Sequence, residues 1–269
     1  MKKCYALLCA YDGSRFAGFQ RQPPLPTVQG SLEAALERLG IRASVEGAGR
    51  TDRGVHACRH VVAFRTAEPV DPDALPDRLA AHLPEGLVVI AARIVPYSFH
   101  PRFSARHKVY RYRVTTSPAP GDWAGRHTWA LPDPRGFPEL THSVRLDRSA
   151  MERALELCRG LHDFALLAHP NARGKTVRIL SEASLRVHGQ GEEAVYEFTF
   201  RSRGFLRHQI RNIVGMTVSA GLGLVDEAEV RRLLGGEGER WRGARAPGRG
   251  LTFLEAGYAP DEDPFPRAS

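Results

Sequence analysis

The sequence predicts an α+β fold made of two ferredoxin-like halves, each with a mainly antiparallel sheet, which meet at a central basic cleft. Two observations predict this fold class. The hydrophobic periodicity gives the element order β-α-β-β-α-β, and the same order occurs twice along the 269 residues. Split βαββαβ units place their helices on one face of an antiparallel sheet. The boundary falls near residue 105, so we expect halves at 1–104 and 105–269.

The first half begins with a strand at 4–11, where side chains alternate between two faces. From 28 to 39 apolar residues recur at helical spacing, with Thr27 as a suitable N-cap and Gly40 as a suitable end. The remaining expected elements are a short strand at 41–46, a β-rich run at 55–64, a helix at 72–83 and a strand at 87–95.

The second half repeats this order around an irregular insert that is rich in Pro and Trp. Asp147 is a suitable N-cap for its first helix, and Gly189-Gln190-Gly191 marks a hairpin turn between two strands. The expected elements are a strand at 108–115, a helix at 148–160, the two hairpin strands, a helix at 205–220 and a strand at 251–258.

The composition predicts a globular protein in the cytoplasm. Hydrophobic residues make up 42% of the chain, and no apolar run approaches the ~20 residues that cross a bilayer. The four cysteines show no CxxC spacing, so a disulfide framework is not expected. We expect no membrane partner.

The net charge of +8 predicts a polyanionic partner, with nucleic acid as the first candidate. Neutralising phosphates releases counterions and supplies affinity that does not depend on sequence. All cations except Lys2, Lys3, Lys108 and Lys175 are arginine. The guanidinium fork suits phosphates and its flat face suits bases, although a GC-rich genome or a hot habitat would produce the same bias.

The strongest local signal is the segment GAGRTDRGVHA at 47–57. It sets one carboxylate, Asp52, between Arg50 and Arg53 in a loop whose glycines permit close approach of the backbone to a ligand. A carboxylate in such a positive setting suits a nucleophile or a charge anchor. An Asx turn or a surface ion pair would use the same residues.

A second segment, residues 99–112, interleaves aromatic side chains with cations. Tyr110 and Tyr112 share one face of the expected strand. Aromatic faces stack on bases with roughly 1 to 3 kcal/mol each, and guanidinium groups hold phosphates. The alternative is that both tyrosines belong to the core, with their hydroxyl groups bonded there.

A third segment, residues 201–212, runs from a strand end into a helix. Arg207 and Arg211 lie one turn apart, near the edge of the apolar helix face. One is placed to bind phosphate and the other to reach inward to a carboxylate. A solvated basic helix face is the alternative.

His56, Cys58 and His60 share one face of the expected strand, which raises the possibility of zinc. A fourth ligand has no obvious source nearby, and single buried Cys and His residues are common in cores. We therefore expect no metal and no cofactor.

The whole chain resembles the TruA-type tRNA pseudouridine synthases. The match is collinear from Tyr11 to Tyr258, and its motifs occur in one order. They are YDGSRFAGFQ at 11–20, GRTDRGVHA at 49–57, FHPRFSA at 99–105, YRY at 110–112, HDF at 162–164 and RNIVG at 211–215.

The resemblance implies a role for each candidate residue. Asp52 matches the catalytic aspartate, Tyr110 the tyrosine that stacks on the flipped uracil, and Arg211 the arginine paired with the aspartate. Arg50 matches an arginine that holds the substrate backbone or fills the space left by the extruded base. Leu251 matches an apolar residue that packs against the active site.

The resemblance also implies the reaction and the partner. We expect a homodimeric enzyme that isomerises uridine to pseudouridine at positions 38, 39 and 40 of the tRNA anticodon stem-loop, with base flipping and an aspartate nucleophile. Three residues depart from the family pattern: Arg53 replaces an alanine, Phe19 a frequent tryptophan and Gln209 a common methionine. We expect Arg53 and Arg207 to bind substrate as well.

Two alternatives belong to other classes. One is a non-catalytic RNA-binding protein with tandem RRM-like units. The expected central strands lack an RRM-type aromatic signature, which argues against it. The other is a zinc-dependent base deaminase, which also flips bases but needs a glutamate beside its metal ligands.

Overall fold

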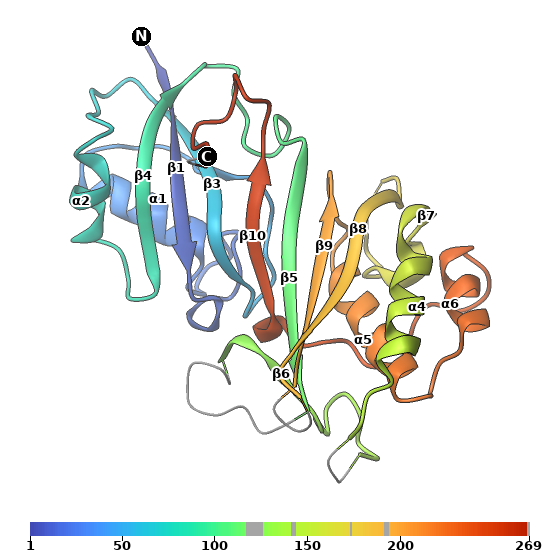
Figure 1. Ribbon diagram of the computed structural model, residues 1–269. Helices are drawn as coiled ribbons and strands as arrows, with labels where there is room; N and C mark the ends of the chain where they lie inside the picture. The colour runs from blue at the N-terminus through green and yellow to red at the C-terminus, as the bar shows by residue number, and fades with distance from the viewer. Residues whose placement is uncertain (117–125, 141–143, 173, 191–193, 268–269) are drawn as a thin grey trace. The chain divides into compact units, whose positions relative to one another are not determined.

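The computed structural model describes residues 1–116, 126–140, 144–172, 174–190 and 194–267. The chain divides into two compact units, the first made of Met1–Lys108 with Thr252–Ser269 and the second of Val109–Leu251. Each unit combines helices with a mostly antiparallel sheet (Figure 1). The α+β class is therefore confirmed.

The first unit carries three full-length strands, two helices, a short strand and the last strand of the chain. These elements are β1 (Lys3–Tyr11), η1 (Gly13–Arg15), α1 (Val28–Arg38), β2 (Glu46–Gly47), β3 (His56–Thr66), α2 (Leu75–Ala80), β4 (Leu87–Val95) and β10 (Leu251–Gly257).

The sheet of the first unit has the strand order β4-β1-β3-β10. Strand β1 is antiparallel to both of its neighbours, β10 runs parallel to β3, and β2 pairs antiparallel with β3. Figure 1 shows α1 behind these strands. Leu32 and Leu36 of α1 and Leu7 of β1 are completely buried, so this helix covers the core.

The second unit carries the remaining strands and most of the helical turns. Its elements are β5 (His107–Thr115), β6 (Trp129–Ala130), α4 (Arg148–Cys158), β7 (Gly160–Asp163), η2 (Ala165–Leu167), β8 (Val177–His188), β9 (Val195–Ser202), α5 (Gln209–Gly221), α6 (Glu227–Leu234) and η4 (Gly248–Gly250).

The sheet of the second unit has the order β5-β9-β8-β7, with β6 parallel to β5. Figure 1 shows α4, α5 and α6 gathered on one side of β8 and β9. Helix α5 is buried along nearly its whole length, including Ile213, Met216 and Val218, and forms the centre of this core.

The expected helix caps are confirmed. The Thr27 hydroxyl accepts a hydrogen bond from the Gly30 amide at 3.3 Å, and the Asp147 carboxylate accepts from the amide of Ser149 at 2.8 Å. Helix α5 begins four residues later than predicted. His208 precedes it with φ of 65°, a left-handed conformation that cannot belong to the helix.

The predicted strand at 41–46 is wrong except at its end, because β2 contains only Glu46 and Gly47. Side chains of α1 bind the backbone of this segment instead. Glu33 accepts from the amide of Val45 at 3.0 Å, and Gln29 donates to the carbonyl of Val45 at 3.1 Å. Strands β6 and β7 and helix α6 were not predicted.

The expected domain boundaries, 1–104 and 105–269, differ from the two units at the C-terminal end. The segment from Thr252 joins the first unit because β10 pairs with β3, with Thr252 opposite His56 and Phe253 opposite Ala57. In the parts of the chain that the structure describes, no helix has the length and apolarity needed to cross a bilayer.

Candidate active site

The Asp52 loop, residues 47–55, connects β2 to β3 in the first unit. Its first end is tied to the sheet, because the Ala48 amide donates to the Val61 carbonyl at 2.9 Å, and a turn closes its second half, where the Val55 amide donates to the Asp52 carbonyl at 3.2 Å. The Asp52 side chain is half-buried, whereas those of Arg50 and Arg53 are exposed. The loop therefore presents one carboxylate between two solvent-facing cations, as the sequence predicts.

The segment after β1 packs directly against this loop. The Phe19 amide donates to the Thr51 carbonyl at 3.0 Å. At Gly18, where φ is 112°, a Cβ would lie 2.8 Å from the same carbonyl oxygen, and at Gly13 a Cβ would lie 2.1 Å from the Val55 carbonyl oxygen. Glycine is required at both positions because the two backbones approach more closely than any side chain permits.

Buried polar side chains underlie the loop. His60 is completely buried, its Nδ1 lies 2.9 Å from the Tyr11 hydroxyl oxygen, and its Nε2 accepts from the Gly49 amide at 3.3 Å. The pKa of His60 is lowered to about 3, chiefly by burial and also by the charge of Lys108, while the Gly49 hydrogen bond acts in the opposite direction. His60 is therefore a neutral residue of the core.

These contacts distinguish the three residues that raised the possibility of zinc. Cys58 is exposed, whereas His60 is buried with both ring nitrogens in hydrogen bonds. His56 is also buried, and its Nδ1 accepts from the Gly13 amide at 3.1 Å. Each histidine thus braces a loop of the first unit.

The two tyrosines of β5 have different surroundings. Tyr112 is completely buried and donates its hydroxyl hydrogen to the Pro247 carbonyl at 2.7 Å. Burial raises the pKa of Tyr112 well above its usual value, against the opposing charge of Arg211. Tyr110 is 7% exposed and its ring meets the edge of Phe205 at 5.2 Å. The core interpretation holds for Tyr112, whereas Tyr110 is buried against the ring of Phe205.

Arg211 lies in the first turn of α5 and is held from two sides. Its Nε donates to the Ala246 carbonyl at 2.7 Å, and the Ala246 amide donates to the Arg211 carbonyl at 3.1 Å. A Cβ at Gly215, one turn later, would lie 1.8 Å from the Ala244 carbonyl oxygen, so the segment 244–246 lies flat on the helix. Arg211 is half-buried, whereas Arg207 is exposed.

Leu251 is the first residue of β10 and is 6% exposed. It follows η4, where a Cβ at Gly250 would lie 2.5 Å from the Tyr112 ring. Leu251 therefore directly follows a glycine that packs tightly against the ring of Tyr112. Asp52, Arg50 and Arg53 belong to the first unit, and the other predicted site residues belong to the second.

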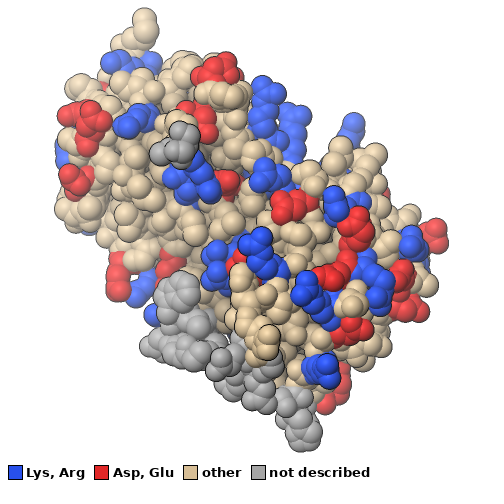
Figure 2. Space-filling view, viewed as in Figure 1, with Lys and Arg blue, Asp and Glu red and all other residues tan. Residues whose placement is uncertain are grey.

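Cations also lie on the sheet of the second unit. Glu197 of β9 accepts a hydrogen bond from Arg113 at 2.8 Å and lies 3.8 Å from Arg111 and from His188. Burial acts to raise the pKa of Glu197, but these positive groups outweigh it and lower the pKa. Figure 2 shows basic and acidic side chains interspersed on this face of the molecule, so the positive charge there is partly compensated.

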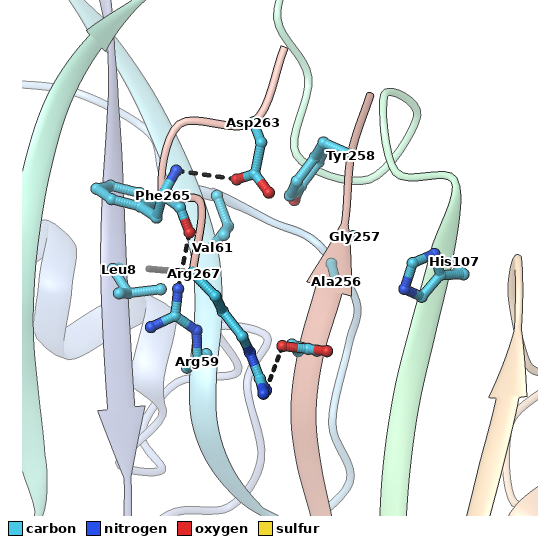
Figure 3. Close-up of a pocket in the computed structure, with 11 residues that line it drawn as sticks. Leu8, Arg59, Val61, His107, Ala256, Gly257, Tyr258, Asp263, Phe265 and Arg267 are labelled. Carbon is cyan, nitrogen blue, oxygen red and sulfur yellow. Dashed lines mark hydrogen bonds and ion pairs between the residues drawn. The ribbon is translucent and has the colours of Figure 1, made fainter. Parts of the chain in front are cut away.

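A pocket of about 230 Å³ lies elsewhere in the first unit (Figure 3). Arginines that line the pocket are bound within it: Arg59 donates to the Phe265 carbonyl at 2.8 Å, and Arg267 lies 2.6 Å from Glu255. The described lining contains none of the predicted site residues. These contacts hold the C-terminal segment on the sheet. The pocket is not the predicted active site.

Comparisons with known proteins give one family. The sequence pattern of the tRNA pseudouridine synthases matches residues 8–104 and 154–259, which include Asp52 and Arg211 but not Tyr110. A solved structure of an unknown protein from Galdieria sulphuraria is 9% identical, covers 75% of this chain and 82% of that chain, and has a TM-score of 0.25. That value is too low to support an argument.

Curated relatives share about a third of their residues with this chain over nearly its full length. The tRNA pseudouridine synthase A of Thermus thermophilus is 38% identical, covering 95% of this chain and 96% of the relative. Those of Halalkalibacterium halodurans and Geobacillus kaustophilus are each 36% identical, covering 93% and 95% of this chain and 90% and 94% of the relatives. The chain belongs to the tRNA pseudouridine synthase family, whose members are isomerases that act on tRNA.

Proposed function

We propose that this protein converts uridine to pseudouridine at positions 38, 39 and 40 of the tRNA anticodon stem-loop, with Asp52 as the nucleophile. The observation that carries the proposal is the Asp52 loop itself. It is a braced loop with one half-buried carboxylate between two exposed arginines, inside a segment that matches the family pattern. The class of reaction follows from the family, and the position in the tRNA and the role of each residue are the proposal.

The reaction needs an anion that forms and releases a covalent bond. The C1′–N1 bond of uridine breaks, the uracil turns, a C1′–C5 bond forms, C5 loses its hydrogen as a proton and N1 gains one. A carboxylate is a suitable nucleophile because it attacks carbon and leaves again without a change of its own protonation state. Asp52 takes this role.

The remaining residues hold the flipped nucleotide. Tyr110 stacks on the uracil, because an aromatic ring on a strand offers a flat face to a base. We assign Arg211 as the partner of the Asp52 carboxylate, because a guanidinium offers several N–H donors in a planar fork and its Nε is held by the Ala246 carbonyl. Leu251 supplies an apolar wall. Extruding a base costs a few kcal/mol, which phosphate contacts must offset.

Exposed arginines are the natural phosphate ligands. Arg50 and Arg53 flank the nucleophile in the loop, and Arg207 lies just before α5. Arg50 also has the length to fill the space that the extruded base leaves. Each contact with a phosphate releases a counterion and makes the affinity for tRNA depend on salt.

The architecture forms part of the proposal. We infer two ferredoxin-like βαββαβ repeats that enclose a basic cleft. The chain order β1-α1-β2-β3-α2-β4 is that of such a repeat, and β5, α4, β8, β9, α5 and β10 follow one another in the same order. The proposed enzyme works in the cytoplasm as a homodimer, in which the second subunit extends the basic surface for tRNA.

Tritium release tests the proposal. The pure protein is incubated with unmodified tRNA transcripts that carry tritium at uracil C5 and have uridine at 38, 39 or 40. Release from each transcript, and none from a matched transcript with cytidine at all three positions, is the expected result. Binding of tRNA without release would favour a non-catalytic RNA-binding protein, and release from the cytidine-substituted transcript would place the target elsewhere.

A further inference from the structure

Three buried polar side chains form a continuous chain beneath the Asp52 loop. His60, Tyr11 and Thr51 are 0%, 6% and 7% exposed. The Gly49 amide lies 3.3 Å from His60 Nε2, His60 Nδ1 lies 2.9 Å from the Tyr11 hydroxyl oxygen, and that oxygen lies 2.9 Å from Thr51 Oγ1. This series of hydrogen bonds therefore starts at Gly49 of the loop and ends at Thr51 of the same loop.

The hydrogen bonds of this chain have a defined direction. The Gly49 amide can only donate, so Nε2 of the neutral imidazole is the acceptor and the proton lies on Nδ1. His60 Nδ1 consequently donates to the Tyr11 oxygen. The phenol hydrogen is then available for Thr51 Oγ1, because the Tyr11 oxygen already accepts from His60. A proton on Nε2 would face the Gly49 N–H and break the first bond.

Aromatic rings fix the orientation of the two central members. Phe19 and Phe253 lie 4.8 Å and 4.7 Å from the His60 ring, measured between centroids, and Phe16 meets the Tyr11 ring at 6.3 Å. Rotation of the imidazole or the phenol would require these rings to move. The neutral state is also secure, because burial lowers the pKa of His60 to about 3.

Each end of this hydrogen-bonded chain directly precedes a residue of the proposed site. Gly49 precedes Arg50, and Thr51 precedes Asp52. The Thr51 carbonyl is held independently by the Phe19 amide at 3.0 Å. The Thr51 side chain and backbone are thus both tied down, which leaves little freedom for the backbone that carries the Asp52 side chain.

We propose that the relay Gly49–His60–Tyr11–Thr51 sets the position of the Asp52 carboxylate for the chemical step, so that Tyr11 and His60 are positioning residues of the reaction. The inference rests on the proposed role of Asp52. An apolar core would fill this space equally well, but it would leave the amide of Gly49 and the hydroxyl of Thr51 without these partners. A displacement of about 1 Å at a reacting group lowers the rate on the order of 100-fold.

The test replaces single hydroxyl groups. Tyr11→Phe removes the middle of the relay, and Thr51→Val removes its end with little change of shape. We expect each to lower kcat about 10- to 100-fold while KM for tRNA changes less than about twofold, because neither hydroxyl is placed on the RNA. The double variant is expected to lose no more than the worse single variant, since both act through one chain.

Tyr5→Phe is the matched control. Tyr5 lies on the same strand and is also buried, and its hydroxyl donates to the Val70 carbonyl at 3.4 Å, outside the relay. We expect wild-type kcat from this variant. Thermal unfolding of all variants shows that each is folded at the assay temperature, and Thr51→Ser, which keeps the hydroxyl, is expected to recover most of the kcat lost in Thr51→Val.

Three outcomes would overturn the inference: a wild-type kcat for Tyr11→Phe, an equal loss in Tyr5→Phe, or a loss that lies in KM alone. Asp52→Asn is assayed beside them. If Asp52→Asn is active, the proposed function fails; if Asp52→Asn is inactive and Tyr11→Phe is normal, only the relay fails.

Discussion

The Asp52 loop and the first turn of α5 both carry residues of the proposed active site, yet they are held in place by different means. The loop has no regular backbone ladder of its own, so it depends on the segment 12–19 and on the buried chain through His60 and Tyr11. Arg211 instead lies on a helix and is fixed by the Ala246 carbonyl. The comparison teaches that a functional group on a loop needs support from several distant segments, whereas one on a helix can be fixed by a single neighbouring segment.

Arg211→Lys should remove the hydrogen bond that fixes the side chain on α5. Lysine keeps the positive charge but loses the planar fork, whose Nε donates to the Ala246 carbonyl and which we propose to donate to the Asp52 carboxylate as well. We expect kcat to fall about 100-fold, the scale of one positioned donor, with tRNA binding preserved. Single-turnover rates and filter binding measure this, with Arg231→Lys on α6 as the control. A loss of less than threefold would contradict the assigned role.

Added methyl groups should break the backbone contacts of each segment. Gly18→Ala places a Cβ 2.8 Å from the Thr51 carbonyl oxygen, and Gly215→Ala places one 1.8 Å from the Ala244 carbonyl oxygen. We expect each to lower the free energy of unfolding by about 2–3 kcal/mol. Gly40→Ala isolates the cost of positive φ, because a Cβ there meets nothing within 4 Å.

Urea denaturation measures the three free energies of unfolding. Equal losses for Gly18→Ala and Gly40→Ala would show that the close contact at Gly18 contributes nothing beyond the positive φ. Gly215 has a helical backbone, so wild-type stability of Gly215→Ala would contradict the close contact there.

The buried histidine should make the first unit sensitive to acid. His60 stays neutral in the folded protein down to about pH 3, whereas in the unfolded chain it takes up a proton below its usual pKa of 6.5. Stability from this group is complete above pH 6.5 and is lost as the pH falls below that value, by up to about 1.4 kcal/mol per pH unit. Urea midpoints between pH 7.5 and 4.5 should fall less steeply in His60→Gln than in wild type, and parallel curves would refute the assignment.

The smallest effect is expected at the exposed cations of the loop. If Arg53 binds a phosphate, Arg53→Ala should reduce the slope of log binding constant against log salt by about one. Arg50→Ala tests the other side of Asp52 in the same way, and Arg42→Ala, which is exposed and outside the loop, is the control. An unchanged slope in Arg53→Ala would leave Arg50 as the phosphate ligand of the loop.

The sequence predicted the elements that local patterns determine. The alternation of side chains between two faces predicted β1 and β4. The N-cap residues Thr27 and Asp147 predicted the starts of two helices. The strand expected at 41–46 failed because its backbone partners are Glu33 and Gln29, side chains of a helix that no local pattern relates to it. The pairing of β10 with β3 joins segments that lie far apart in the sequence, so no local pattern predicts it either.

The site shows the same division. Asp52, Arg50 and Arg211 were predicted from charge, glycine spacing and motif order. The relay was not predicted, and His60 was weighed as a metal ligand or a core residue. Tyr11 reaches His60 through an irregularity in the register of β1 and β3, where Cys9 pairs with His60 but Tyr11 pairs with Ala57. A bulge of this kind depends on the assembled sheet, so the sequence alone carries little signal for it.

The most direct test of the central claim is tritium release from C5-labelled tRNA by Asp52→Asn, measured beside tRNA binding. Asparagine has nearly the same shape as aspartate but no nucleophilic charge. The account predicts no release above background with an affinity for tRNA close to that of wild type. Release at the wild-type rate, or loss of tRNA binding by a normally folded variant, would contradict a catalytic role for Asp52.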